Sequence, residues 1–256
     1  MLLLRALLLT LFVGVSLPSL AANTEQSVYD LRTGIQIALL DFYHYQADEG
    51  NPQLLSELNQ VMTRNDSQRA ALRAELPSGF VSQTQSLDND WQHFAALMNQ
   101  NVEEIKKSNF PELQVVTMMR EVAGRMMDNL DQISQSLRDS GEVSLGEADI
   151  WARHQKELLL TITERYLERA ASSMGAPLTV SDVTINDLCQ QFASGLDRVQ
   201  EKRLPDTAQA AMGKIRGQWL FISKAANDTE SRLVPFLVMR YTNGIITQLN
   251  QIAGLS

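Results

Sequence analysis

Two arginines in matching sequence contexts are the residues of this chain best suited to bind a ligand. The segment Arg120-x-x-x-Gly124 recurs as Arg240-x-x-x-Gly244, and a methionine precedes each arginine. Residues four apart share one face of a helix, so each glycine removes a side chain beside a guanidinium. The fork of donors on arginine suits planar oxyanions. The motif predicts either a small-anion site or arginines that flank a helix core and extend into solvent, with glycines that let a neighbouring helix approach.

Residues that could perform catalysis or bind a metal are scattered. His44, His93 and His154 fall on three different predicted helices, and none has a second histidine three or four residues away. The sequence lacks the patterns of serine hydrolases, zinc proteases, phosphate-binding loops and dinucleotide-binding turns. We therefore expect no enzymatic activity, no cofactor and no bound metal.

The single cysteine and the net charge narrow the range of partners. Cys189 cannot form a disulfide within the chain, and it lies in an apolar helical stripe with Leu188 and Phe192, which favours burial over pairing between chains. The chain has 22 basic and 30 acidic side chains, a formal net charge of -8. Because an acidic surface repels phosphate backbones, we expect no nucleic-acid partner.

The elements that position these residues are predicted to be helices. Apolar residues recur at intervals of three and four through nearly the whole chain, and Pro, Gly and Asn clusters interrupt the pattern. Strand-like alternation occurs only at Leu178–Val183, a segment too short to build a sheet. We predict an all-α protein of about eight helices, near residues 28–45, 54–76, 87–105, 113–137, 147–173, 185–199, 212–222 and 234–252.

An internal repeat divides these helices into two sets of four. Pro77 precedes Trp91 by fourteen residues, and Pro205 precedes Trp219 by the same number, which gives an offset of 128. The offset falls to 124 at a later proline and to 120 at the two arginine motifs. Each decrease of four residues in the offset corresponds to about one helical turn. A second helical hairpin that is one turn shorter in each helix would therefore keep the same helix faces in contact. We predict tandem antiparallel four-helix-bundle units at residues 22–142 and 143–256, stacked end to end or side by side.

The first 21 residues have the composition of a secretory signal peptide. Arg5 is followed by an apolar run from Ala6 to Val15, then by Pro18 and small residues. That run is shorter than the roughly 20 residues of a membrane-spanning helix. We expect cleavage after Ala21 or Ala22, a periplasmic or secreted location, and no membrane span in the mature chain.

Two segments resemble a known sensory family. Val115–Ile133 and Val234–Ile252, each with an arginine in a long helix of a duplicated four-helix unit, resemble the N-terminal sensory region of type IV pilus methyl-accepting chemotaxis transducers. They are more distantly similar to the periplasmic bundle of nitrate-sensing kinases, in which an arginine grips the anion. That resemblance implies the same role for Arg120 and Arg240.

These observations together give two functional expectations. The first is a non-catalytic, exported, sensor-like binding or adaptor module for a protein partner in the cell envelope. Because the sequence contains neither flanking membrane helices nor a kinase, we expect any signal to pass through that partner. The alternative is a small-anion-binding protein that uses Arg120 and Arg240.

Overall fold

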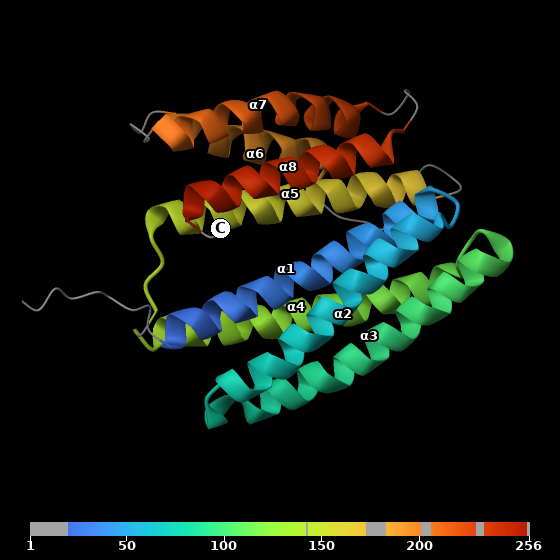
Figure 1. The fold of residues 1–256 in the computed structure, drawn as a ribbon, viewed down its shortest axis with the longest axis horizontal. Helices are drawn as coiled ribbons and strands as arrows, with labels where there is room; N and C mark the ends of the chain where they lie inside the picture. Colours follow the sequence, from blue (N-terminus) through green and yellow to red (C-terminus); the bar gives the residue numbers. More distant parts are fainter. Residues whose placement is uncertain (1–19, 142, 173–182, 201–205, 229–232, 255–256) are drawn as a thin grey trace, which may run out of the picture.

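The computed structural model describes residues 20–141, 143–172, 183–200, 206–228 and 233–254 (Figure 1). Within these ranges the chain forms eight α-helices, one short 3-10 helix and no strand, which confirms the all-α prediction. The elements are α1 (Leu20–Ala47), α2 (Pro52–Glu75), η1 (Ser78–Phe80), α3 (Val81–Ser108), α4 (Leu113–Asp139), α5 (Glu147–Ala171), α6 (Ile185–Gln200), α7 (Asp206–Asn227) and α8 (Pro235–Ala253).

Two predictions fall wholly or mostly outside the described residues. One is the signal peptide, of which only the last two residues are described, at the start of α1. The other is the strand-like segment 178–183, of which only Val183 is described.

Local side-chain chemistry sets where the helices begin and end. Asn51 accepts a hydrogen bond on its side chain from the backbone N–H of Gln53 at 2.9 Å, with Pro52 in the first turn of α2. Before α6, Thr184 and Asp187 exchange backbone-to-side-chain hydrogen bonds of 2.9 and 3.1 Å, which form a capping box. These caps satisfy backbone N–H groups that have no partner inside the helix.

The same pattern of helix packing occurs twice. In the first half, α1 packs on α2 and α4, α3 packs on α4, and α2 meets α3. In the second half, α5 packs on α6 and α8, α7 packs on α8, and α6 meets α7. The halves lie side by side and meet mainly through α1 and α5 (Figure 1). The duplication remains a prediction, and this repeated packing supports it.

Helix lengths account for the drift in the repeat offset. Helices α3 and α4 have 28 and 27 residues, whereas α7 and α8 have 22 and 19. The two tryptophans occupy matching core positions, with Trp91 on α3 5% exposed and Trp219 on α7 7% exposed. The second hairpin is therefore shorter while its buried face is retained.

The contact between α1 and α5 has the register of the repeat itself. The side chain of Glu25 bonds to that of Arg153, and the side chain of Gln36 bonds to that of Glu164. Each pair is separated by 128 positions, the same offset as the two tryptophans. Matching positions of the two units therefore face each other along parallel helices, as they would across the twofold axis of a homodimer.

Candidate functional site

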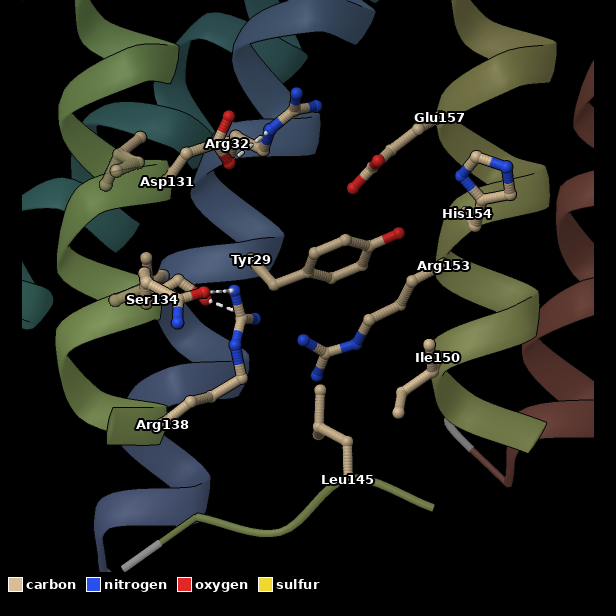
Figure 2. A pocket seen from close by; sticks show the side chains of 13 residues that line it. Tyr29, Arg32, Asp131, Ser134, Arg138, Leu145, Ile150, Arg153, His154 and Glu157 are labelled. Atoms are coloured by element: carbon tan, nitrogen blue, oxygen red, sulfur yellow. Dashed lines mark hydrogen bonds and ion pairs between the residues drawn. The ribbon is translucent and has the colours of Figure 1, made fainter. Parts of the chain in front are cut away.

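A cavity of about 540 Å³ lies where the two units meet, between α1, α4 and α5 (Figure 2). Both units contribute to its wall, because α1 and α4 belong to the first predicted unit and α5 to the second. Polar and charged side chains alternate with apolar ones around it. The lining residues are Val28, Tyr29, Arg32, Leu130, Asp131, Ser134, Gln135, Arg138, Leu145, Ile150, Arg153, His154 and Glu157.

A buried carboxylate holds one wall of this cavity in place. The side chain of Glu25 is fully buried, and its Oε1 accepts hydrogen bonds from Ser134 Oγ at 2.7 Å and from Arg138 Nη1 at 3.1 Å. Arg153 Nη1 donates to both carboxylate oxygens of Glu25, at 2.8 and 2.9 Å. Hydrogen bonds to ionised groups are about twice as strong as neutral ones. This network therefore ties α4 and α5 to the beginning of α1.

Tyr29 occupies the centre of the cavity wall. Its ring lies beneath the guanidinium of Arg153, with 4.2 Å from Cζ to the ring centroid, which is a cation–π contact. The residue is 6% exposed, and its hydroxyl has no hydrogen-bond partner among the described residues. Burial, with a further contribution from the nearby Glu157 carboxylate, raises the pKa of Tyr29 well above its ordinary value. The hydroxyl is therefore a neutral donor at all physiological pH values.

Two more residues that line this cavity, Arg32 and Glu157, have polar atoms without a hydrogen-bond partner among the described residues. Arg32 Nε donates to Asp131 Oδ1 at 2.8 Å, but Arg32 Nη1 is buried without a partner among the described residues. The carboxylate of Glu157 makes no hydrogen bond or ion pair with any described residue and points into the cavity (Figure 2). Because buried polar groups are normally satisfied, the buried Arg32 Nη1 is a candidate to contact a bound molecule, as is the partly buried Glu157 carboxylate.

Arg120, one of the two arginines singled out from the sequence, lies at a different place in the contact between the units. Its Nη1 is 3.2 Å from Glu168 Oε1 and its Nη2 is 3.8 Å from Glu164 Oε1, both on α5. Glu168 is fully buried at the side chain, and Glu164 also accepts a hydrogen bond from Gln36 at 3.2 Å. Burial raises the pKa of Glu164, and the Arg120 charge opposes that shift. The Arg120 guanidinium thus already contacts two carboxylates.

The four residues of the repeated motif are not brought together and do not form two matching sites. Arg240 is exposed on α8, whereas Arg120 is half-buried. A Cβ atom added at Gly124 would meet nothing within 4 Å, but one added at Gly244 would lie 2.5 Å from the Gln218 side chain. Gly244 therefore permits close packing of α7 on α8, and Gly124 leaves open space. The anion site at these residues remains a prediction.

The repeat also explains why the two arginines differ. At the offset of 128, the positions on α1 that match Glu164 and Glu168 are Gln36 and Leu40. Neither is acidic, so α1 offers no carboxylate where the matching helix of the other unit has two. The same motif therefore forms an ion-pair bridge in one unit and stays exposed in the other.

The residues around Glu25 were not predicted as a site. Reasoning from single helices could not find them, because the interacting side chains come from three helices. One signal was available: Glu25 and Arg153 are opposite charges at the repeat offset of 128. Had the two units been expected to meet through their first helices, this pair would have been the first candidate.

The other sequence candidates have ordinary environments. Cys189 is 4% exposed, which confirms the predicted burial, and His44 is 6% exposed, whereas His93 and His154 are exposed. No group of three or more His, Cys, Asp or Glu residues that could hold a metal ion occurs in the described part of the chain. Among the helices that the structure describes, none combines the length and the apolar character needed to cross a membrane.

Comparisons with protein-family models, with curated proteins and with solved structures found no match to this chain.

Proposed function

We propose that this chain is a non-catalytic, exported binding or adaptor protein, and that its ligand occupies the cavity between α1, α4 and α5. The observation that carries the proposal is the cavity itself, because three of the residues that line it have polar groups without a partner among the described residues. These groups are the Tyr29 hydroxyl, Arg32 Nη1 and the Glu157 carboxylate. The volume of about 540 Å³ falls within the range of roughly 300–1,000 Å³ that is usual for small-molecule sites.

The position of the cavity favours a sensory or adaptor role over simple storage. Its walls come from both units, so a ligand that contacts Arg32 on α1 and Glu157 on α5 would favour one arrangement of the units over others. A ligand shifts such an equilibrium only through a difference in affinity between the two arrangements. A protein partner in the cell envelope would recognise the preferred arrangement by binding the outer faces of the bundles.

A thermal-shift screen of the purified protein tests ligand binding at this site. At a concentration one hundred times its dissociation constant, a ligand should stabilise the protein by about 2.7 kcal/mol. For a chain of this size that corresponds to roughly 5–10 °C in Tm. The panel should contain inorganic anions, small carboxylates, amines and amino acids.

Two cavity variants and one control locate any binding that the screen finds. Tyr29→Phe and Glu157→Gln each remove one unpartnered polar group and should reduce the shift. As the control, Arg125→Gln removes a charged side chain outside the cavity, where Arg125 on α4 lies 2.7 Å from Asp90 on α3, and should leave the shift unchanged. A panel in which no compound raises Tm, or shifts that both cavity variants retain in full, would overturn the proposal.

The alternative function, small-anion binding at Arg120 and Arg240, makes a distinct prediction. Nitrate, sulfate or phosphate should raise Tm, and Arg120→Ala or Arg240→Ala should abolish the effect. Arg120→Ala also removes the guanidinium that lies 3.2 Å from the buried Glu168, so the unfolding temperature of this variant must be measured without anions first. Arg240→Ala changes an exposed side chain and provides the cleaner test.

A further inference from the structure

One acceptor and two donors without a partner among the described residues belong to side chains that line the same cavity. The acceptor is the Glu157 carboxylate, and the donors are the Tyr29 hydroxyl and Arg32 Nη1. Figure 2 shows the Glu157 carboxylate and the Tyr29 hydroxyl directed into the space between α4 and α5. A simple anion would satisfy the donors only, and a simple amine would satisfy the carboxylate only.

The charges around the cavity are balanced. Three guanidiniums, Arg32, Arg138 and Arg153, are matched by three carboxylates, two on the lining (Asp131 and Glu157) and one behind the wall (Glu25). A ligand with a net charge would leave one charge without compensation in a partly desolvated site, which is costly. A ligand that carries one positive and one negative group would preserve the balance.

The rest of the lining is aliphatic. Val28 and Leu130 are buried, Leu145 is partly buried, and Ile150 is exposed on α5. Leu145 and Ile150 therefore offer an apolar surface next to the charged groups. A ligand with a short hydrocarbon chain would be stabilised here by removing this apolar surface from water.

From these three features we infer that the cavity binds a small zwitterion with an aliphatic side chain, of the chemical class of the aliphatic α-amino acids. The ligand ammonium contacts Glu157, its carboxylate contacts Arg32 Nη1 and the Tyr29 hydroxyl, and its side chain lies against the aliphatic residues. This inference rests on the proposed ligand-binding function and specifies its ligand class.

Isothermal titration calorimetry with three matched compounds tests the ligand class. L-Leucine carries both charges, 4-methylpentanoate lacks the ammonium, and 3-methylbutylamine lacks the carboxylate. We expect L-leucine to bind at least tenfold more tightly than either of the other two. Equal or tighter binding of 4-methylpentanoate or of 3-methylbutylamine would overturn the inference that the cavity binds a zwitterion.

Variants assign each charge of the ligand to its residue. Glu157→Gln should weaken L-leucine at least tenfold and leave 4-methylpentanoate unchanged or tighter. Arg32→Gln should weaken L-leucine and 4-methylpentanoate but not the amine, since its partner Asp131 is half exposed and can hydrate. Arg125→Gln serves again as the control and should change none of the three affinities.

The outcomes separate this inference from the function on which it rests. Suppose that L-leucine does not bind but that another compound of the thermal-shift panel does, and that Glu157→Gln weakens its binding. The inferred ligand class is then wrong, and the proposed binding site is retained. If no compound of any charge type binds, both fail.

Discussion

Replacing Glu25 by glutamine should strongly destabilise the protein, because one buried carboxylate compensates two guanidiniums. The substitution keeps the size of the side chain and removes its charge. The amide oxygen can still accept hydrogen bonds from Ser134 and Arg138. The amide NH₂ group, however, takes the place of one of the two oxygens to which Arg153 Nη1 donates, at 2.8 and 2.9 Å. A donor then faces a donor.

The magnitude follows from the burial of the two arginines. Arg138 is 36% exposed at the side chain and can hydrate when Glu25 loses its charge, so it adds little. Arg153 is 7% exposed and cannot hydrate in the same way. Breaking a buried pair costs about 3–5 kcal/mol, and we expect the lower end, about 3 kcal/mol, because the Tyr29 ring still contacts the guanidinium. That is a large part of the roughly 5–15 kcal/mol by which proteins are stable.

Urea unfolding followed by circular dichroism at 222 nm measures this loss. Glu103→Gln is the matched control, because it removes an exposed ion pair with Lys106 at 2.8 Å on α3 and should change the midpoint little. A loss below about 1 kcal/mol for Glu25→Gln, at an unchanged slope, would refute the view that a desolvated ion pair joins the two units.

Three further predictions concern other parts of the fold. Gly195→Ala should lower the free energy of unfolding in urea by about 1–3 kcal/mol, because the added Cβ would lie 1.9 Å from the buried Gln155 amide. Gly124→Ala should instead raise it by about 0.5–1 kcal/mol, because the added Cβ meets nothing within 4 Å and alanine favours the helix. Burial, with the neighbouring Glu57 charge, raises the pKa of Asp41 to about 7, above its ordinary 3.8. The folded state therefore holds that proton more tightly than the unfolded state, so stability should fall as pH rises from about 4 to 7, and Asp41→Asn should remove this fall in unfolding curves taken across that range. Burial raises the pKa of the Cys189 thiol to about 11, so it should react with a disulfide reagent only after urea is added, and rapid labelling of the native protein would contradict its burial.

Export is tested separately from the fold. We propose that the chain is cleaved after Ala21 or Ala22, which would place Glu25 within the first residues of the mature protein. Amino-terminal sequencing of protein recovered from the periplasm or the medium of an expressing bacterium checks this. A mature chain that still begins at Met1 would contradict it.

The helices could be predicted from the sequence because their signals are local. Apolar spacing and the breakers Gly50, Pro77 and Pro111 fix where helices run and end, whatever the rest of the chain does. The drift of the repeat offset from 128 to 120 likewise predicted a shorter second hairpin, and the lengths of α7 and α8 agree. Both inferences need only the order of residue types along the chain.

The site depended on tertiary structure, because its chemistry arises from side chains of three helices. Nothing local distinguishes Arg120 from Arg240. They differ because α4 packs near Glu164 and Glu168, whereas the matching positions on α1 are not acidic. Similarly, Glu25 is a charged residue of the kind that usually lies at the surface. It is buried beside Arg153 because α1 packs in parallel against α5. Burial and charge pairing across 128 positions are set by how the units meet, and helical periodicity does not encode that.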